Sequence, residues 1–357
     1  LYQYLFVVDG KEAIDSSNPN SVSNGMGGRN SLLIVGDRNE SKPVIFTKSY
    51  ENSKIILTKD LSTGIVVFWE NQYVEVIETE EGYEFEIPTE ATKTGRSYLR
   101  AWAYSDSELS NDLLIPLQNG KVVQTSEQLT RHDFHTWNMY FVLIDRFKEG
   151  NFSNTEKIDD PGIHPKANYY GGDFAGITQT IKEGYFKEIG VNTLWLSPIS
   201  QNPETAYGLW DQGGVTTKFS GYHGYWPISS SKTDHRFGSA EEFKELLDVA
   251  HQNGMNVILD YVANHVHEEH PVYQNHPDWV TDLYLPDGRM NTELWDEQRL
   301  TTWFDTFMPT LDFSKQEVID TMTDSALYWV KEFDLDGFRH DATKHIQLDF
   351  WRTLTRK

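Results

Sequence analysis

The fold is indicated first by residues 239–265, which read SAEEFKELLDVAHQNGMNVILDYVANH. Ser239 followed three residues later by Glu242 is a capping box, which predicts the start of a helix. Its apolar face is formed by residues at helical spacing, namely Phe243, Leu246, Leu247 and Ala250. Gly254 is placed to end the helix, and Asn256–Leu259 predicts a buried strand directly after it. This stretch therefore contains a helix followed at once by a strand.

The same alternation extends in both directions from this stretch. Further strands are predicted at Met139–Ile144, Thr193–Leu196 and Gly337–Arg339, and the continuous apolar run of the first is typical of a strand buried on both faces. One helix is predicted through Ile177, Ile181, Tyr185 and Ile189 up to Gly190, and another begins at a second capping box, Ser314 with Glu317. Strand–helix alternation of this kind predicts parallel βα units.

Residues 131–357 thus hold four βα units, with an inserted subdomain at about 265–313 after the third strand. A connection that long is typically functional. A (β/α)8 barrel needs eight such units and about 250 residues. Four parallel strands fit either the first half of such a TIM barrel or an open sheet. For the barrel, we expect the remaining units on a longer chain or on a second chain.

The first 130 residues follow a different pattern, with short apolar runs separated by turn-rich stretches, which is typical of β-sandwiches. We expect the end of one sandwich at 1–36, a polar break at Asp37–Lys42 and a second sandwich at 37–130. The predicted strands are Tyr4–Val8, Ser31–Val35, Val44–Thr47, Lys54–Thr58, Gly64–Trp69, Tyr83–Ile87, Ser97–Tyr104 and Asp112–Leu117.

Composition excludes several classes of function. The net charge of −23 disfavours nucleic acid and anionic lipid as partners. The chain has no cysteine, which excludes disulfides and thiolate chemistry, and no apolar run long enough to span a membrane. Aromatic residues make up 13% of the chain, which suits sugar stacking as well as core packing. Composition leaves the compartment open, because a chain without cysteine is compatible with either redox environment.

Chemically active side chains gather where the third and fourth predicted strands end. The third strand leads into Asp260–His265 and the fourth into Asp336–Asp341. Arg339 and Asp341 are two residues apart, so in an extended strand they point to the same face. An arginine beside a carboxylate favours the ionised form. A fixed, ionised carboxylate is what a glycosidase nucleophile needs, although a structural ion pair fits the same pattern.

Two segments, Asp260–His265 and Asp336–His345, resemble conserved regions of the α-amylase family of glycoside hydrolases. Four other segments resemble the family in the same order along the chain. They are Asp145-Arg146-Phe147, Tyr170-Gly171-Gly172-Asp173, Trp195-Leu196-Ser197-Pro198 and Gly221-Tyr222-His223-Gly224-Tyr225-Trp226. Together the six motifs cover about residues 137–345. The resemblance implies a (β/α)8 barrel and a retaining hydrolysis of α-1,4 and α-1,6 bonds in starch-type α-glucans, maltooligosaccharides or cyclodextrins.

Individual site residues follow from the same resemblance. Asp341 lies at the nucleophile position, and Arg339 would hold it. His223, His265 and His345 match positions that bind sugar hydroxyls. Tyr225 matches an aromatic residue that stacks on the sugar, and beside it Trp226 is either a second sugar contact or plain core. Asp260 matches a carboxylate that organises Arg339 and Tyr225, and Lys344 a residue on the leaving-group side.

Calcium is the cofactor that the resemblance implies. Asn264 matches one ligand, and His345 matches another through its carbonyl group, but Thr310 stands where an aspartate is expected. The surrounding pattern Met308-Pro309-Thr310-Leu311 resembles the neopullulanase and cyclomaltodextrinase branch, which often lacks this site. A second site would use the positions Glu149, Asn151, Asn154, Thr155, Gly171 and Asp173, of which Glu149 and Thr155 depart from the usual residues.

Two alternatives remain open. The family's general acid and its third carboxylate lie on later strands than the four present here, so this chain is expected to be a fragment that lacks the acid. The first alternative is a non-catalytic α-glucan-binding paralogue. The second alternative is a zinc hydrolase that uses His265, His267 and neighbouring acidic and histidine residues, since a His-x-His after a barrel strand can bind zinc.

Overall fold

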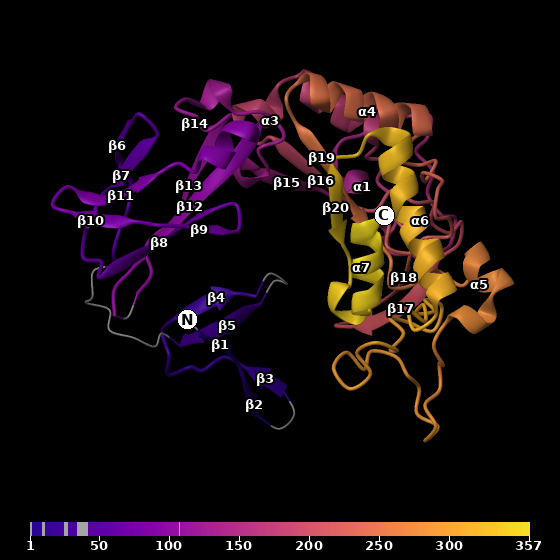
Figure 1. The fold of residues 1–357 in the computed structure, drawn as a ribbon. Coiled ribbons are helices and arrows are strands. Elements are labelled where there is room, and N and C mark those ends of the chain that lie inside the picture. The colour runs from indigo at the N-terminus through magenta and orange to yellow at the C-terminus, as the bar shows by residue number, and fades with distance from the viewer. Residues whose placement is uncertain (1, 9–10, 25–27, 34–41, 107) are drawn as a thin grey trace. The chain divides into compact units, whose positions relative to one another are not determined.

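The computed structural model describes residues 2–8, 11–24, 28–33, 42–106 and 108–357, and it divides into two compact units, Leu1–Leu129 and Thr130–Lys357 (Figure 1). The predicted break at Asp37–Lys42 lies almost entirely outside the described residues. Within those residues, no helix combines the length and apolarity needed to cross a membrane.

The first unit begins with a small three-stranded sheet and a hairpin. The sheet has the order β1-β5-β4, and the hairpin pairs β2 with β3. The predicted strand Tyr4–Val8 is therefore wrong as one element, because the chain divides it between the sheet and the hairpin. The bounds are β1 Tyr2–Tyr4, β2 Phe6–Val8, β3 Lys11–Ala13, β4 Ser21–Ser23 and β5 Arg29–Leu33.

The rest of the first unit consists of two antiparallel sheets that share one core. One has the order β10-β11-β7-β6 and the other β14-β13-β12-β8-β9. Alternate residues of β12 are buried, as expected where one face of a sheet packs on another. The bounds are β6 Thr47–Glu51, β7 Lys54–Leu57, β8 Gly64–Trp69, β9 Gln72–Val74, β10 Ile77–Thr79, β11 Gly82–Glu86, β12 Arg96–Tyr104, β13 Leu113–Gln118 and β14 Lys121–Val122.

Trp69 and Trp102 belong to this pair of sheets and differ in their surroundings. Trp69 is 6% exposed and its Nε1 donates to Ser97 Oγ at 3.0 Å, so it is a core residue. Trp102 is partly exposed and lies beneath the Arg100 guanidinium group, 5.0 Å from the ring centre. The sequence pattern alone does not separate these two surroundings, because both residues lie in apolar strands.

The second unit is built on a parallel sheet with the order β15-β16-β19-β20, and the four strands were all expected. Their bounds are β15 Met139–Val142, β16 Thr193–Leu196, β19 Asn256–Tyr261 and β20 Gly337–His340. Strand β19, which is central, is buried at every position. Strand β15 is not buried on both faces as predicted, because it is an edge strand of the described sheet and leaves Met139 54% exposed.

Helices cover this sheet (Figure 1). Their bounds are α1 Ile144–Phe147, α2 Phe174–Lys182, α3 Tyr185–Glu188, α4 Ala240–Gln252, α6 Gln316–Phe333 and α7 Leu348–Arg356. The predicted capping box of α4 is confirmed, with Ser239 Oγ accepting from Glu242 N. The predicted helix through Ile177 and Ile189 is in fact two helices, because Gly184 adopts a left-handed conformation between them.

The capping box predicted at Ser314 is wrong. Helix α6 begins after Lys315, and no side chain caps it. Ser314 Oγ instead donates to Asp312 Oδ1 at 2.6 Å, which uses the hydroxyl group outside the helix. Local competition of this kind is common for serine near a helix start.

Two insertions follow the carboxyl ends of the parallel strands. After β16 comes the hairpin β17 Tyr207–Gln212 with β18 Val215–Phe219, which the sequence pattern did not reveal. Its turn, Gly213–Gly214, has positive φ at both residues, which glycine adopts without strain. After β19 comes the longer predicted insertion, with the short helix α5 Pro271–Asn275 and isolated bridges such as His265–Thr310.

Candidate active site

The candidate site begins where β19 and β20 run side by side. In the parallel register Asp260 pairs with Arg339 and Tyr261 with His340. Parallel neighbours in a sheet lie about 4.8 Å apart, so their side chains on one face can touch. Asp341 follows directly, and its N–H donates to Tyr261 O at 3.0 Å. The strand register therefore brings together three charged residues that the chain separates by up to 81 positions.

Arg339 contacts both carboxylates. Its Nη1 lies 2.9 Å from Asp260 Oδ1 and 3.0 Å from Asp341 Oδ1. Burial opposes the charge of the guanidinium group, but the two carboxylates overcome this effect and raise the pKa of Arg339 above its usual range. The predicted juxtaposition of Arg339 with Asp341 is present, and Arg339 links Asp341 to the buried Asp260.

Asp260 is the acceptor at the centre of the site. It is 1% exposed and accepts from Arg339, from Tyr225 Oη at 2.8 Å and from Trp195 Nε1 at 3.1 Å. Burial raises the pKa of Asp260, while Arg339 and Tyr225 act in the opposite direction. A buried carboxylate needs partners of this kind, so Asp260 holds Arg339, Tyr225 and Trp195 around one point.

Trp195 is a site residue that sequence reasoning missed. It was noted only as part of a strand motif, yet its indole contacts Asp260, and the Arg339 guanidinium lies 5.1 Å from its ring centre. A signal was present, because Trp195 interrupts the aliphatic residues of β16 at a half-exposed position. Its partner is on another strand, so the contact itself could not be read from the sequence.

Tyr225 and two histidines form the next layer. His265 Nε2 lies 3.0 Å from Tyr225 O, and His223 Nδ1 accepts from Tyr225 N at 3.1 Å. Because a carbonyl oxygen only accepts, the His265 proton is on Nε2, and its buried Nδ1 has no partner among the described residues. Burial lowers the pKa of His265, and it lowers that of His223 to about 4, so both rings are neutral near pH 7. They can therefore accept as well as donate hydrogen bonds.

Trp226 lies among aromatic rings. It is 7% exposed, and its ring centre is 4.7 Å from that of His223 and 5.1 Å from that of Phe307. Tyr207, at the base of the β17–β18 hairpin, completes the contacts. This environment resembles that of a core residue, and a direct sugar contact by Trp226 stays a prediction.

Lys344 and His345 contact the long insertion. Lys344 Nζ lies 3.4 Å from Asp296 Oδ1, and His345 Nδ1 lies 2.7 Å from Arg299 O. Arg299 in turn donates to Lys344 O. These two residues thus connect the segment after β20 to the insertion, and the described contacts do not join them to Asp341.

The loop after β15 contains the residues expected to bind calcium. Both polar atoms of the Asn154 side chain are buried and have no partner in the described structure, and Glu149 accepts from Thr155. Gly171 lies close to this pair, and its φ of +96° is a conformation that glycine adopts without strain. A buried amide oxygen without a partner fits a cation that prefers oxygen ligands.

The other expected ligands of this loop have partners already. Asp173 caps α2 and accepts from the N–H groups of Gly150, Asn151 and Gly176. Asn151 Oδ1 accepts from Ser153. The unpartnered amide of Asn154 is thus the feature of this loop that fits an added cation. Ligand roles for Glu149, Asn151, Asn154, Gly171 and Asp173 all stay predictions.

The other candidate calcium site rests on Asn264. Its amide is 1% exposed, and neither polar atom has a partner in the described parts of the chain. Thr310, at the position where an aspartate was expected, donates its hydroxyl to Thr302 O at 2.8 Å. This site thus has one unpaired buried amide and no carboxylate at Thr310. In the described residues, no three His, Asp or Glu side chains are placed to share a metal ion, so nothing supports the zinc alternative at His265 and His267.

Comparison with known proteins identifies the family. The model of the alpha amylase catalytic domain matches residues 141–353. The chain belongs to the alpha-amylase family. The matched range includes all six motifs noted above, from Asp145 to His345, and so contains all the residues around Asp260.

Similar proteins carry related names. The chain is 30% identical to the cyclomaltodextrin glucanotransferase of Bacillus sp. (strain 1-1), over 60% of this chain and 31% of that protein. It is 29% identical to the intracellular maltogenic amylase of Bacillus subtilis, over 60% of this chain and 34% of that protein. An Anoxybacillus alpha-amylase structure matches with 31% identity and a TM-score of 0.51, over 63% of this chain and 45% of that one. The chain thus spans about a third of the length of these two curated relatives.

The alpha-amylase likeness supports a TIM-barrel glycoside hydrolase fold for the second unit. The four described parallel strands do not close into a barrel; their order leaves β15 at one edge and β20 at the other. The expected barrel is therefore supported as a fold family, and the described residues contain an open four-stranded part of it.

Proposed function

We propose that this protein cleaves α-glucosidic bonds by a retaining mechanism with Asp341 as the nucleophile. The observation that carries the proposal is the position of Arg339 Nη1 between Asp341 Oδ1 and the buried Asp260, at the ends of adjacent parallel strands. Parallel α/β folds place their chemistry at this end of the strands. Arg339 fixes the Asp341 carboxylate, and Asp260 fixes Arg339.

In the proposed reaction, Asp341 attacks the anomeric carbon and forms a covalent glycosyl intermediate, which water or a second sugar then releases. This chemistry needs a second carboxyl group about 5–5.5 Å from the first, which protonates the leaving oxygen. We propose that this acid lies outside the 357 residues, in the remainder of the barrel. The proteins similar to this chain include one named a glucanotransferase and one named an amylase, so a sugar and water are both candidate acceptors.

The proposed substrates are starch-type α-glucans, maltooligosaccharides or cyclodextrins, with α-1,4 and α-1,6 bonds. The names of the similar proteins support this class, as does the unpaired His265 Nδ1 beside Tyr225. The neutral rings of His223 and His265 suit an uncharged polyol, because they donate and accept without a charge to desolvate. His223, His265 and His345 would bind hydroxyl groups, Tyr225 and Trp226 the sugar faces, and Lys344 the leaving-group side.

The finer assignments belong to the same proposal. Residues 1–36 would be the end of a starch-binding-like sandwich and 37–130 a spacer sandwich. Residues 131–357 would be the first half of the barrel, with the subdomain 265–313 inserted. We also propose a structural calcium ion held by Glu149, Asn154 and Gly171, and an assignment to the neopullulanase and cyclomaltodextrinase branch.

The test is Asp341→Asn in the full-length protein, assayed on maltohexaose. Removing a nucleophile lowers turnover by several orders of magnitude, on the order of 10⁴ or more. Asp349→Asn, an exposed aspartate of α7 paired with Arg352, is the matched control and keeps the wild-type rate. A near-wild-type rate for Asp341→Asn contradicts the mechanism. Maltohexaose binding without turnover by the wild-type protein would favour the non-catalytic paralogue instead.

A further inference from the structure

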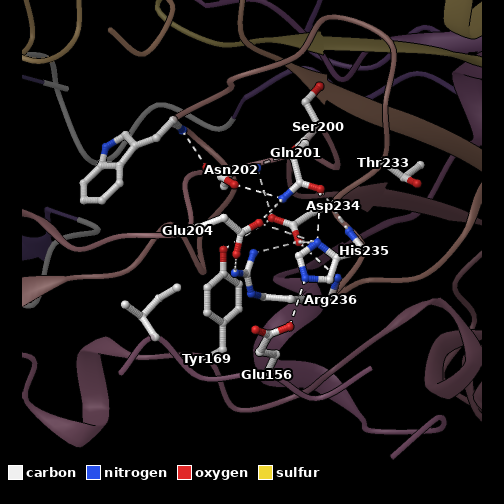
Figure 2. Close-up of polar contacts among 12 residues, drawn as sticks. Glu156, Tyr169, Ser200, Gln201, Asn202, Glu204, Thr233, Asp234, His235 and Arg236 are labelled. Atoms are coloured by element: carbon white, nitrogen blue, oxygen red, sulfur yellow. Dashed lines mark hydrogen bonds and ion pairs between the residues drawn. The ribbon is translucent and has the colours of Figure 1, made fainter. Parts of the chain in front are cut away.

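A buried polar cluster contacts the segment that carries Tyr225. It joins the loop after β16 to the loop before α4, and Figure 2 shows its side chains pointing toward one another. Asn202 and Asp234 are fully buried, and Arg236 is 2% exposed. We call these three residues, with Tyr169 and Glu204, the Asp234 cluster.

The charges of the cluster fix the position of Asp234. Arg236 donates to Asp234 Oδ1, at 3.0 Å from its backbone N and 3.3 Å from Nη1, and its Nη2 pairs with Glu204. Tyr169 Oη donates to Asp234 Oδ2 at 3.3 Å, and the Arg236 guanidinium lies 4.6 Å from the centre of the Tyr169 ring. A buried carboxylate with this many partners has little freedom to move.

Asn202 connects this cluster to the candidate active site. Its backbone N–H donates to Asp234 Oδ2 at 3.1 Å, and its side-chain Oδ1 accepts from Trp226 N at 3.0 Å. Its Nδ2 donates to Ser200 O at 2.7 Å, so both ends of the amide are engaged. Gly221 allows this close packing, because a Cβ there would lie 2.6 Å from Asn202 Cβ.

The backbone N–H that Asn202 holds belongs to Trp226, which is next in sequence to the residue that contacts Asp260. Tyr225 precedes Trp226, and its hydroxyl donates to Asp260 while its carbonyl accepts from His265. A shift of the Trp226 amide would therefore move Tyr225 against the carboxylate that holds Arg339. We propose that Asn202, held by Asp234, is a positioning residue that fixes Tyr225 against Asp260. As a role in catalysis, this inference rests on the proposed function.

The experiment compares two buried asparagines in the full-length protein, Asn202→Ala and Asn256→Ala. Asn256 is also about 1% exposed, and its amide holds Arg131 at the opposite end of the strand that carries Asp260. Removing either amide leaves buried groups unpaired and lowers stability. If Asn202 had only a structural role, the two variants would both lose stability and would be alike in hydrogen exchange around Tyr225 and in kcat.

Two readouts separate them. Hydrogen exchange of the peptide that covers residues 221–228 is expected to accelerate at least about tenfold in Asn202→Ala and to stay at the wild-type rate in Asn256→Ala. The value of kcat on maltohexaose is expected to fall at least about tenfold in Asn202→Ala with KM changed less than threefold, while Asn256→Ala stays within about twofold of wild type for both. Equal exchange in the two variants overturns the clamp, and an unchanged kcat overturns the positioning role.

A double mutant asks whether Asn202 acts through Tyr225. If it does, adding Asn202→Ala to a Tyr225→Phe variant lowers kcat by less than about twofold, because the contact that Asn202 positions is already gone. A further tenfold loss of kcat in the double mutant overturns the proposal. Should Asn202→Ala fail to fold, Gly221→Ala displaces the same amide with a single methyl group and is expected to show the same exchange and kcat changes.

Failure of the proposed function gives a different result. A wild-type protein that leaves maltohexaose intact removes the kinetic readout and refutes that function. The exchange comparison between Asn202→Ala and Asn256→Ala needs no substrate and still supports or overturns the clamp by itself.

Discussion

Tyr225 Oη donates to Asp260 Oδ2 at 2.8 Å, although 35 positions of the chain separate the two residues. This contact joins a loop after the second parallel strand to the end of the third. It also fixes the buried carboxylate that holds Arg339, and thereby the orientation of Asp341. The candidate site is thus a set of contacts between strand ends.

Tyr225→Phe removes the hydroxyl and keeps the ring. A hydrogen bond to a charged group contributes about 1.5–3 kcal/mol, so kcat/KM on maltohexaose is expected to fall about ten- to hundredfold. Tyr185→Phe, at an exposed position of α3, is the control and keeps the wild-type value. Equal activity of the two variants would mean that the Asp260 contact does not serve the reaction.

Cleavage is expected to be restricted to α-linked glucans. In a retaining displacement the nucleophile attacks the face of the sugar opposite the leaving group. A β-linked glucan would present its leaving group on the side of Asp341. Release of reducing sugar from amylose but not from laminarin or cellulose checks this, and NMR of the first product formed should show the α-anomer. Sugar release from laminarin would refute the substrate class.

The free energy of unfolding is expected to fall in acid, because the folded protein holds buried histidines in their neutral form. Burial lowers the pKa of His267 and His270 to about 4, against about 6.5 when exposed. Between these values the unfolded chain binds a proton that the folded chain does not, so each histidine removes up to about 3 kcal/mol as pH falls from 6.5 to 4. Burial of Asp145 acts oppositely, because it raises the pKa of that carboxyl to about 6.

A variant isolates one of these histidines. His270→Asn can still accept from the N–H of Val272 at the start of α5 but does not titrate. Its free energy of unfolding, measured by urea denaturation from pH 7 to 4.5, should fall less steeply than that of the wild type, by up to about 1.4 kcal/mol per pH unit. His132→Asn, at an exposed position, should match the wild-type slope. Parallel slopes for His270→Asn and the wild type would exclude a buried neutral His270.

Calcium is expected to stabilise the fold through the loop after β15. A ligand at a hundredfold excess over its Kd adds about 2.7 kcal/mol to the free energy of unfolding. Millimolar calcium should therefore raise Tm by several degrees and a chelator should reverse the effect. Asn154→Ala should abolish this shift, and Asn264→Ala should retain it. The opposite pattern would place the ion at Asn264, and no shift in the wild-type protein would refute the calcium assignment.

Several features could be read from the sequence because they are local. The capping box at Ser239, the buried strand Asn256–Leu259 and the common face of Arg339 and Asp341 depend on residues a few positions apart. Their helical or twofold spacing is set by backbone geometry, which does not require the rest of the fold. The family motifs likewise predicted Tyr225 and Asp260 as site residues, and the two side chains are in contact.

Other features depended on the tertiary structure. The contact of the Trp195 indole with Asp260 and the clamp from Asn202 to Trp226 were not apparent from the local patterns. Ser314 failed as a cap for a local reason instead, because Asp312, two positions before it, competes for its hydroxyl. The side-chain oxygen of Asn202 and the carboxylate of Asp260 acquire their partners from segments 24 to 79 positions away. Sequence spacing determines which way a side chain points along its own strand or helix, whereas the packing of separate segments decides which buried polar groups meet.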